Sequence, residues 1–329
     1  MEYRYLGSTG VQVSQLCFGT MSFGGDADEV ISGALYRRCR DAGINFFDCA
    51  NSYSGGRAEE ILGKLIAGSR EELVITSKVF STTGPDERLH GASRRNIMAE
   101  IEKSLKRLGT DHLDVYFIHH FDDHTPLAET LRALDDLVRS GKILYPAASN
   151  FAAWQVAKAL GLSALHHWAP FKVLQPMYNL VKRQAEVEIL PMALSEGLGV
   201  ISYSPLGGGL LSGKYGPGEH PEHGRLVDNS AYQQRYDAEW VYDTAGAFTA
   251  FARQRGYSPA ALAVAWVGSH PGISAPIIGS RNLAQLEDSL QAASIPMTAE
   301  LRAEISALSP EPPPAHDRGH PSELKQRPV

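Results

Sequence analysis

Short apolar runs alternate with stretches of helical spacing along most of this chain, and no other feature of the sequence restricts the fold as much. The runs that we interpret as strands cover residues 16–19, 44–48, 73–78, 113–118, 143–148, 171–175, 200–203 and 275–278. The stretches that we interpret as helices cover residues 27–42, 58–67, 93–108, 127–140, 151–160, 184–196, 283–291 and 299–308. Strands and helices that alternate in this way form parallel sheets with helical crossovers. Eight such units within roughly 300 residues predict a closed (β/α)8 barrel.

An open, doubly wound sheet is the alternative fold. It would require a Gly-x-Gly-x-x-Gly motif after the first strand, whereas the run from Gly19 to Gly24 has glycine at its first and last positions only. Before the first unit, two short stretches at 3–6 and 11–14 flank a turn at 7–10 that begins and ends with glycine. This pattern predicts a β-hairpin, which we expect to close the N-terminal mouth of the barrel.

Two segments fall outside the alternation. Residues 207–240 are rich in glycine and proline and show no clear period, which is typical of a lid over a site. Residues 310–329 are proline-rich and polar, so we expect a tail that is disordered or lies along the surface. The sequence therefore predicts a single barrel domain over residues 1–309, followed by this tail.

Composition narrows the class of protein. With 43% hydrophobic and 21% charged residues in 329 positions, the chain is typical of a soluble globular protein with a sizeable core. The formal net charge of −6 argues against nucleic acid or an anionic membrane as the main partner. Three cysteines without metal-ligand spacing fit reduced thiols. The N-terminus lacks the layout of a signal peptide and no apolar run has membrane length, so we expect a cytoplasmic protein.

The ends of the predicted strands carry the candidate functional residues. In a barrel of this kind the carboxyl ends of all strands open on one face, where active sites are found. Polar or flexible residues stand at nearly every one of these ends: Gly19, Thr20, Asp48, Lys78, His119, Ser149, Asn150, Gln175, Tyr203, Gly279, Ser280 and Arg281. Tyr53 follows Asp48 by five residues, on a predicted loop. If the barrel forms, these side chains converge on one pocket.

Each of these residues also has an ordinary structural explanation. Asp48 could cap the turn that follows it, and Tyr53 could be a half-buried aromatic residue. Lys78 could be a surface lysine, His119 a hydrogen-bonded histidine, and the polar pair at 149–150 a helix N-cap. These explanations do not account for polar side chains at nearly every strand end, and we therefore favour a common site.

An acid, a lysine, a tyrosine and a histidine that converge suggest a specific chemistry. A neighbouring ammonium lowers the pKa of a phenol, and a carboxylate keeps that ammonium charged. The phenol can then give a proton to a carbonyl oxygen, and a neutral imidazole can orient the same oxygen. No side chain supplies a hydride, so a cofactor must. The paired histidines at 119–120 and 166–167 are adjacent in sequence, which is poor spacing for a metal ion.

With these residues in place, the sequence resembles the aldo-keto reductase superfamily over nearly all of residues 1 to 309. The resemblance rests on short motifs that occur in order along the chain: Leu6–Gly10, Phe18–Met21, Asn45–Asp48, Thr76–Lys78, Asp114–His119, Ser149–Phe151, Gln175–Asn179, Tyr203–Leu206 and Ile278–Arg281. The family fold is a (β/α)8 barrel with an N-terminal hairpin, which agrees with the pattern of runs. The run at 207–211 and the long lid are similar to the bacterial and potassium-channel β-subunit branches.

The resemblance implies a role for each catalytic candidate. Tyr53 is expected to be the proton donor, with Lys78 lowering its pKa and Asp48 pairing with Lys78. His119 is expected to orient the carbonyl group. NADP(H) is the expected cofactor, because Arg281 suits a 2′-phosphate; alternatively, Arg281 is a solvated arginine at a helix start.

The cofactor contacts that the resemblance implies extend over most strand ends and part of the lid. They are Gly19, Thr20, Met21, Asp48, Ser149, Asn150, Gln175, Tyr203, Ser204, Pro205, Leu206, Gly208, Leu210, Lys214, Ile278, Gly279, Ser280, Arg281, Gln285 and Asp288. Residues 149, 150 and 175 are expected to hold the nicotinamide carboxamide, and Tyr203 to stack on the ring. Residues 206, 208 and 210 are expected near the pyrophosphate, and residues 280, 281 and 285 near the adenosine.

The expected substrate contacts are Phe23, Tyr53, His119 and His120. His120 stands where many relatives have arginine or tryptophan, so it bears on specificity. With aromatic residues of the lid, this lining suits a moderately apolar aldehyde or ketone, and a sugar aldehyde is the alternative.

Three functions remain open from the sequence. The first is reduction of a small carbonyl substrate with NADPH. The second is a cofactor-binding regulatory subunit similar to the potassium-channel β subunits. The third is an alcohol or sugar dehydrogenase that uses the same residues in reverse. Self-association is possible, because the family includes monomers and ring assemblies.

Overall fold

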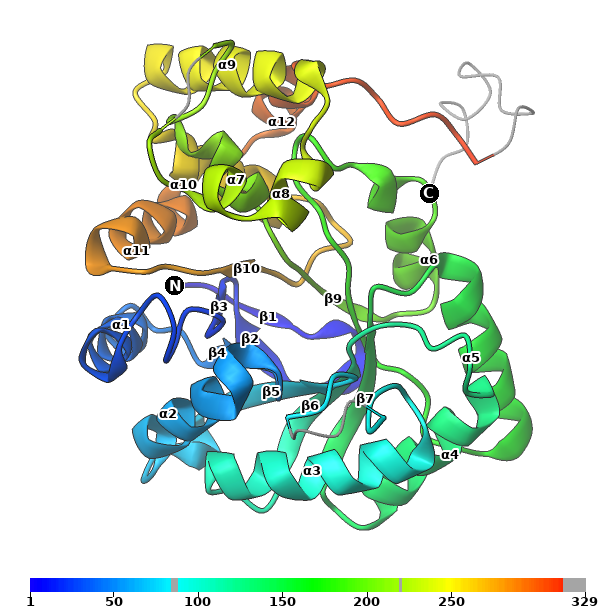
Figure 1. Cartoon of the computed structure of the whole chain (residues 1–329). Coiled ribbons are helices and arrows are strands. Elements are labelled where there is room, and N and C mark those ends of the chain that lie inside the picture. Colours follow the sequence, from blue (N-terminus) through cyan, green and yellow to red (C-terminus); the bar gives the residue numbers. More distant parts are fainter. Residues whose placement is uncertain (84–87, 219–220, 316–329) are drawn as a thin grey trace.

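Eight parallel strands close into a barrel at the centre of the molecule, with helices around it (Figure 1). The structure is a computed structural model, and it describes residues 1–83, 88–218 and 221–315. The strands of the barrel are β3 (Cys17–Gly19), β4 (Phe46–Asp48), β5 (Val74–Val79), β6 (Leu113–Ile118), β7 (Ile143–Ser149), β8 (Val173–Gln175), β9 (Gly199–Ser202) and β10 (Ala275–Ile278). They pair in chain order, and β10 pairs with both β9 and β3 to close the ring. The predicted (β/α)8 barrel is confirmed.

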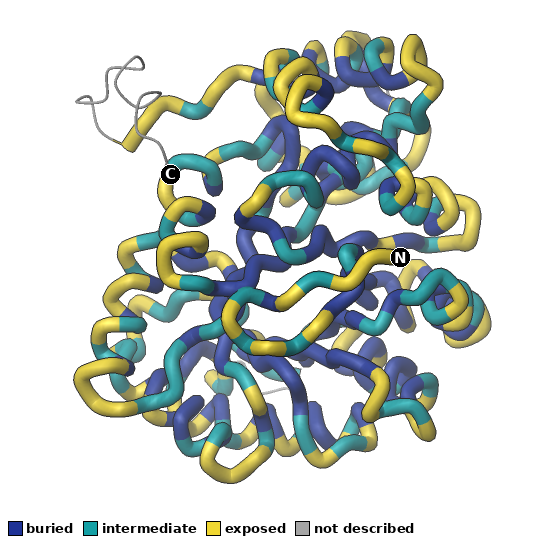
Figure 2. The backbone as a smooth tube through the Cα atoms, turned by 180° about the vertical axis from the view of Figure 1, so that it is seen from behind, coloured by how far each residue is buried: buried dark blue, intermediate teal, exposed yellow. Residues whose placement is uncertain are grey.

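The helices form an outer ring whose inner faces are buried against the barrel (Figure 2). They are α1 (Glu29–Asp41), α2 (Arg57–Ile66), α3 (Arg94–Leu108), α4 (Leu127–Arg139), α5 (Ala153–His166), α6 (Ile189–Ser195), α7 (Arg225–Asp228), α8 (Ser230–Arg235), α9 (Glu239–Gln254), α10 (Pro259–Gly268), α11 (Leu283–Leu290) and α12 (Ala299–Ser306). Helix α3 illustrates the pattern. Ile97, Ile101 and Leu108 recur on one face and are fully buried, as expected for an amphipathic helix on a core. Its start is capped by Ser93, which accepts a hydrogen bond from the Asn96 amide.

The predicted N-terminal hairpin forms from β1 (Tyr3–Tyr5) and β2 (Gln12–Ser14), joined through the 3-10 turn η1 (Gly7–Thr9). Leu6 and Val13 are fully buried and pack with the residues that fill the barrel interior. At Gly7 the backbone has φ +55°, and a Cβ there would lie 2.2 Å from the amide nitrogen of Gly199. Only glycine allows this close approach, which holds the hairpin against the first residue of β9. The hairpin thus closes the N-terminal end of the barrel.

Several predicted element limits differ from the structure for identifiable reasons. The helix expected at 184–196 is divided into a 3-10 turn, η4 (Gln184–Glu186), and α6. Pro191 has no N–H to continue a helix from residue 187, so α6 begins only at Ile189. The polar pair at 149–150 is not a helix N-cap, because α5 begins at Ala153 with Ala152 at that position. Asn150 instead has a left-handed backbone, with φ 59°.

The region from 207 to 268 holds more regular structure than the sequence predicts. The lid contains the 3-10 turn η5 (Gly207–Ser212) and the short helices α7 and α8. Helices α9 and α10 follow it and were not predicted. Residues 310–315 of the predicted tail have no regular secondary structure, and its remaining residues, 316–329, lie outside the described part of the chain. None of the helices that the structure describes is both long enough and apolar enough to cross a membrane.

Candidate active site

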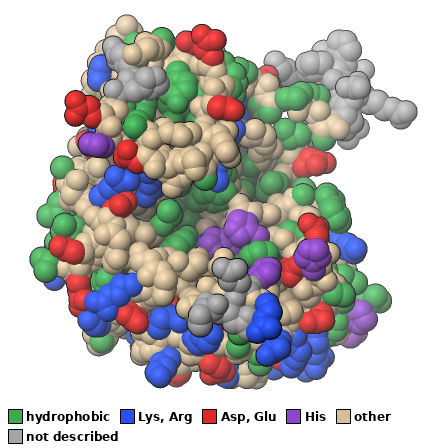
Figure 3. All heavy atoms as spheres, viewed as in Figure 1, with side chains coloured by type: hydrophobic (Ala, Val, Ile, Leu, Met, Phe, Trp, Pro, Cys, Tyr) green, Lys and Arg blue, Asp and Glu red, His purple; other side chains and the backbone are tan. Residues whose placement is uncertain are grey.

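A cavity of about 440 Å³ opens at the carboxyl ends of the barrel strands, below the lid. Figure 3 shows a hollow in this face of the molecule, with histidine side chains beside it. Most residues predicted for the site line the cavity: Gly19, Met21, Asp48, Tyr53, His119, His120, Ser149, Asn150, Gln175, Tyr203, Ser204, Pro205, Leu206, Gly208, Lys214, Ile278, Gly279, Ser280, Arg281, Gln285 and Asp288. Residues more than 250 positions apart in sequence are therefore brought to one cavity by barrel closure.

Four predicted residues do not line the cavity, and they divide into two kinds. Lys78 and Thr20 lie just behind its wall, where the Thr20 hydroxyl donates to the Asp48 carbonyl (3.0 Å). Phe23 and Leu210 are fully buried and belong to the hydrophobic core. The Phe23 ring packs on Phe18, with 5.8 Å between ring centroids, because the chain turns inward after β3. We therefore correct the expectation that Phe23 and Leu210 face bound molecules.

Lys78 is the most enclosed charged residue of the site. Its side chain is fully buried, and its ammonium group donates three hydrogen bonds. The acceptors are Asp48 Oδ2 at 2.6 Å, the carbonyl of Cys49 at 2.7 Å and the Tyr53 hydroxyl at 3.1 Å. All three N–H groups of a lysine are thus used. Because strand β5 points alternate side chains to opposite faces, Lys78 projects into the barrel while Ser77 projects toward the helices.

The carboxylate of Asp48 is held by three donors on two strands, β5 and β8. In addition to Lys78, the Thr76 hydroxyl donates to Oδ1 at 2.7 Å and the Gln175 amide donates to the same oxygen at 2.9 Å. A buried carboxylate with this many donors has a fixed position. Sequence reasoning missed Thr76. Its place two residues before Lys78, on the same face of β5, was the available signal.

Tyr53 begins a short 3-10 turn, η2 (Tyr53–Gly56), that directly follows β4 and the loop 49–52. The next residue, Ser54, has φ 49°, and two glycines with positive φ follow it. This tight turn directs the phenol back over the barrel. The Lys78 ammonium lies 4.8 Å from the centre of the Tyr53 ring and 3.1 Å from its hydroxyl. The phenolic O–H remains available to donate into the cavity, because the contact with Lys78 uses the oxygen as acceptor.

Burial and neighbouring charged groups shift the pKa values of Lys78 and Tyr53 in opposite directions. Burial lowers the pKa of Lys78, but the neighbouring Asp48 and Tyr53 raise it by a larger amount. The net pKa is therefore above its ordinary value, and the ammonium stays charged. Burial raises the pKa of Tyr53 to about 12, although Lys78 lowers it. The sequence predicted only the lowering by Lys78. The effect of burial on the pKa is the larger of the two, and Tyr53 is protonated at neutral pH.

His119 presents an uncharged imidazole to the cavity. Burial, then Lys78 and His120, lower the pKa of His119 to about 2. The ring lies edge-on to Tyr53, with 6.1 Å between centroids, and stacks on His120 at 4.9 Å. A neutral imidazole held between two rings can donate one hydrogen bond in a fixed direction, as the proposed orienting role requires.

The lowered pKa of His119 predicts a pH-dependent stability. A histidine that stays neutral in the folded state but accepts a proton when unfolded favours unfolding below its unfolded pKa of about 6.5. The free energy of unfolding should therefore fall between pH 6.5 and 5.0, by at most about 1.4 kcal/mol per pH unit from this residue. Denaturant titrations at both pH values should show a smaller fall for His119→Gln than for the wild type. Burial and Arg302 also lower the pKa of His270, to about 4. The free energy of unfolding of His119→Gln should therefore still fall to some extent. An identical fall in both proteins would show that His119 is not held neutral.

The cavity wall beside Tyr53 consists of amide and hydroxyl groups. The Tyr203 hydroxyl donates to the side-chain oxygen of Asn150 at 2.7 Å, and the Asn150 amide donates to the His119 carbonyl at 2.9 Å. Ser149 donates to the Gln175 carbonyl at 2.9 Å. Asn150 and Ser204 both have φ 59°. Non-glycine residues with such backbones concentrate at functional sites, and here both follow a strand at the cavity rim.

Cations also line the cavity. Lys214 and Arg281 were predicted there, whereas Arg225 and Arg235 of the lid were not. The two lid arginines lie against the Tyr232 ring, at 5.7 and 5.1 Å from its centre. Arg281 is paired with Asp26 of the β3–α1 loop, at 2.9 Å. The lid has no period from which a sequence could show which of its arginines face inward.

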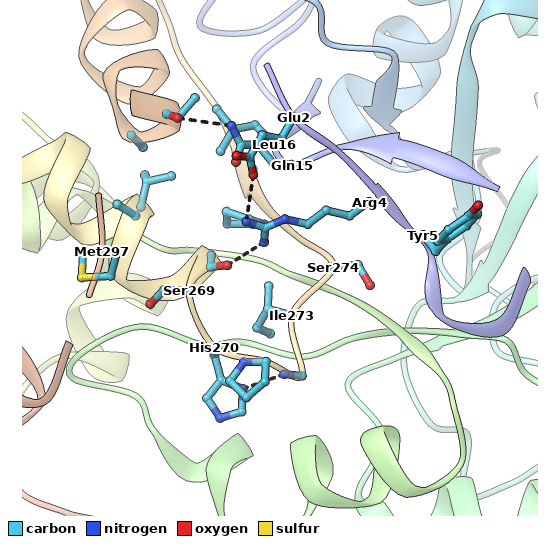
Figure 4. A pocket seen from close by; sticks show the side chains of 18 of the residues that line it. Glu2, Arg4, Tyr5, Gln15, Leu16, Ser269, His270, Ile273, Ser274 and Met297 are labelled. Carbon is cyan, nitrogen blue, oxygen red and sulfur yellow. Dashed lines mark hydrogen bonds and ion pairs between the residues drawn. The ribbon is translucent and has the colours of Figure 1, made fainter. Parts of the chain in front are cut away.

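A second cavity, of about 620 Å³, lies at the opposite end of the barrel (Figure 4). Its polar side chains join the hairpin to neighbouring segments. Arg4 lies across it and donates to the Gly268 carbonyl at 2.9 Å, and Gln15 donates to the Ala293 carbonyl at 3.3 Å. His270 accepts a hydrogen bond from the Gly272 amide. Arg4 and Gln15 thus attach the hairpin region to neighbouring segments, and we assign the chemistry to the first cavity.

The described residues contain no cluster of three or more histidine, cysteine or acidic side chains that could hold a metal ion. All three cysteines are buried and free of disulfides. Burial raises the pKa of each thiol. These thiols are therefore unreactive near neutral pH and take no part in the site.

Comparison with known proteins agrees with the fold. The sequence profile of the Aldo/keto reductase family matches residues 15–310 of this chain. The chain is 38% identical over 327 residues to an oxidoreductase of Bacillus subtilis, YrpG. This match covers 95% of this chain and 97% of the length of YrpG. A probable voltage-gated potassium channel subunit beta of Oryza sativa is 36% identical over 94% of this chain and 96% of its own length. An L-glyceraldehyde 3-phosphate reductase of Escherichia coli is 33% identical over 89% of this chain and 87% of its own length.

Proposed function

Since this chain belongs to the aldo/keto reductase family of oxidoreductases, we propose that it reduces an aldehyde or ketone to an alcohol, with NADPH as the cofactor and Tyr53 as the proton donor. One observation supports this most directly. At the floor of the cavity the Lys78 ammonium lies 3.1 Å from the Tyr53 hydroxyl and 2.6 Å from Asp48. A buried phenol beside a buried, paired ammonium is an arrangement for proton transfer.

The proposed reaction uses the side chains as follows. The carbonyl oxygen of the substrate accepts hydrogen bonds from the Tyr53 hydroxyl and from the neutral imidazole of His119. As negative charge develops on that oxygen, Tyr53 transfers its proton. The Lys78 ammonium stabilises the phenolate that remains, and Asp48 holds the ammonium in place. Charged groups in an enclosed site stabilise such changes more strongly than they would in water.

The residues of the cavity fit a nicotinamide dinucleotide. Both amide and hydroxyl groups and several cations line the cavity. Ser149, Asn150 and Gln175 would hold the carboxamide, and Tyr203 would lie against the ring. Lys214 and Arg281 would meet the phosphates. When bound, this cofactor would supply the hydride, which no side chain can provide.

A regulatory role without turnover is the second candidate, and it rests on the relatives described as channel subunits. The fully formed arrangement of Asp48, Tyr53, Lys78 and His119 favours an enzyme. The test is steady-state oxidation of NADPH by the purified protein with a panel of aliphatic, aromatic and sugar aldehydes. We expect turnover with at least one aldehyde. Tight cofactor binding without turnover across the panel would favour the regulatory role.

The preference for NADPH over NADH can be tested at Arg281. Replacing Arg281 with alanine should weaken NADPH binding about tenfold, the effect of losing a charged hydrogen bond worth roughly 1.5 kcal/mol, and should leave NADH binding nearly unchanged. Fluorescence titration with both dinucleotides measures this without turnover. Arg38→Ala is a matched control, because Arg38 also forms a surface ion pair, with Glu287, but lies outside the cavity. Equal weakening of both dinucleotides would exclude a contact between Arg281 and the 2′-phosphate.

A further inference from the structure

Two buried carboxylates lie behind the site, between the barrel and helices α2 and α3, and the proposed chemistry does not use them. Glu59 on α2 is fully buried and Glu100 on α3 is 1% exposed. Buried charges are retained where they have specific partners. Both carboxylates have partners that connect the segment carrying Tyr53 to the strand carrying Lys78.

Asn51 makes the first of these connections. It lies between Asp48 and Tyr53 in the loop 49–52, and it is fully buried. Its backbone amide donates to the Lys78 carbonyl at 3.2 Å. Its side-chain amide donates to the carbonyl of Ser81, just after β5, and to Glu100 Oε2, both at 2.8 Å. The loop is thus attached to β5 and the residues after it at two points, and to α3 at a third.

The orientation of the Asn51 amide is fixed by these partners. Its side-chain oxygen is buried and has no hydrogen-bond partner among the residues that the structure describes. In the reversed orientation this oxygen would face the Glu100 carboxylate and the Ser81 carbonyl, which both repel it. The side chain therefore acts through its two donors. Glu100 is held in turn by Lys103, whose ammonium lies at 2.7 Å.

Glu59 makes the second connection, just after the turn that begins with Tyr53. Its carboxylate accepts from the Ser77 hydroxyl at 2.5 Å and pairs with Arg107 of α3 at 2.7 Å. Ser77 is the neighbour of Lys78 on β5. Helices α2 and α3 lie side by side (Figure 1), and at Gly63 a Cβ would meet the Arg107 carbonyl at 2.5 Å. The segment with Tyr53 is therefore attached to the strand of Lys78 on both of its sides.

We propose that Asn51, held by Glu100, is a positioning residue that sets the separation of the Tyr53 hydroxyl from the Lys78 ammonium. This proposal rests on the proposed role of Tyr53. Asn51 is fully buried and is not among the residues that line the cavity, so we expect it to touch neither substrate nor cofactor. Displacing a catalytic group by about 1 Å can lower a rate roughly 100-fold. Asn51 should therefore affect the chemical step and not the binding of either ligand.

The test compares Asn51→Ala with Glu100→Ala and Glu100→Gln in the full-length protein. Both alanine variants should lower kcat about 10- to 100-fold, with KM for the aldehyde and the fluorescence-measured Kd for NADPH within about twofold of wild type. The deuterium isotope effect on kcat, measured with 4-deuterated NADPH, should rise toward its full value, because transfer becomes the slow step. Glu100→Gln keeps an oxygen that accepts from Asn51, so it should retain most of the wild-type kcat.

The control is Asp114→Ala at the other end of the barrel. Asp114 is also buried, pairs with Arg70 at 2.8 Å, and accepts from the Ile75 amide of β5 at 2.8 Å. Its loss should reduce stability without changing kcat per folded molecule or the isotope effect. If Asn51→Ala does not fold, Glu100→Ala decides alone. The proposal is overturned if either alanine variant keeps the wild-type kcat. It is also overturned if either variant has an unchanged isotope effect and loses no more kcat than Asp114→Ala does. Absence of turnover in the wild type would instead refute the proposed function.

Discussion

Replacing Tyr53 with phenylalanine should lower kcat by about 10²- to 10⁴-fold, the range that a general acid contributes. Phenylalanine keeps the ring that lies 4.8 Å from the Lys78 ammonium and edge-on to His119, so the shape of the site is retained. Only the hydroxyl that would donate the proton is removed. Steady-state NADPH oxidation measures kcat, and fluorescence titration should give an unchanged Kd for the cofactor.

Tyr116 offers a matched control for this substitution. It is also buried, on β6, and its hydroxyl has no hydrogen-bond partner within the described residues. Tyr116→Phe removes the same atom from the same type of residue, and kcat should stay at the wild-type value. Comparable activity in Tyr53→Phe and Tyr116→Phe would remove Tyr53 from its role as acid, whatever the family of the protein.

The second large effect is expected at the buried ion pair. Lys78→Met should destabilise the protein by about 3–5 kcal/mol, because it leaves Asp48 as a buried charge without its cation. It should also abolish measurable turnover, since the stabilising charge next to Tyr53 is lost. Asp48 would keep the hydrogen bonds from Thr76 and Gln175, which do not replace the ammonium. Denaturant titration measures the first effect and NADPH oxidation the second.

A double variant separates these two consequences. In Asp48→Asn/Lys78→Met neither charge remains, and we expect much of the lost stability to return while turnover stays absent. The double-mutant cycle then gives the coupling between the two side chains. If the double variant were as unstable as the sum of the single variants, the pair would not act as a unit. If Lys78→Met alone kept its activity, the proposed stabilisation of the phenolate would be wrong.

The barrel could be predicted from the sequence because its signals are local. Each strand is a short apolar run that ends in a polar or glycine residue, so the strand ends and the residues on them were identified together. Asp48, Lys78 and His119 all stand at such ends. Parallel strands in a closed barrel then require these residues to meet at one face, although nothing local in the sequence relates one to another.

Helix α10 could not be predicted for the opposite reason. Residues 260 to 267 of this helix are all buried, so it has no polar face. A helix that is apolar on every side shows no 3.6-residue period and cannot be distinguished by pattern from a strand or a buried loop. The two buried carboxylates were missed for a related reason. Glu59 and Glu100 lie in amphipathic helices, and a sequence cannot show that a charged residue faces inward.

Contacts between the ends of the chain were also beyond sequence reasoning. Asp26 pairs with Arg281 only because β10 lies next to β3 in the closed barrel. The sequence suggested either a phosphate contact or a solvated arginine for Arg281, and the structure shows a third state, an ion pair with a neighbouring loop. A 2′-phosphate would have to compete with the Asp26 carboxylate for the same guanidinium group.

The buried thiols make the protein convenient for labelling. Cys17, Cys39 and Cys49 are enclosed, and burial raises the pKa of each, so a maleimide dye should leave them untouched in the native state. A single cysteine introduced at Ala231, which is exposed on α8 of the lid, would then be the one reactive position among the described residues. The native chain thus needs no prior removal of cysteines before an optical reporter is attached above the cavity.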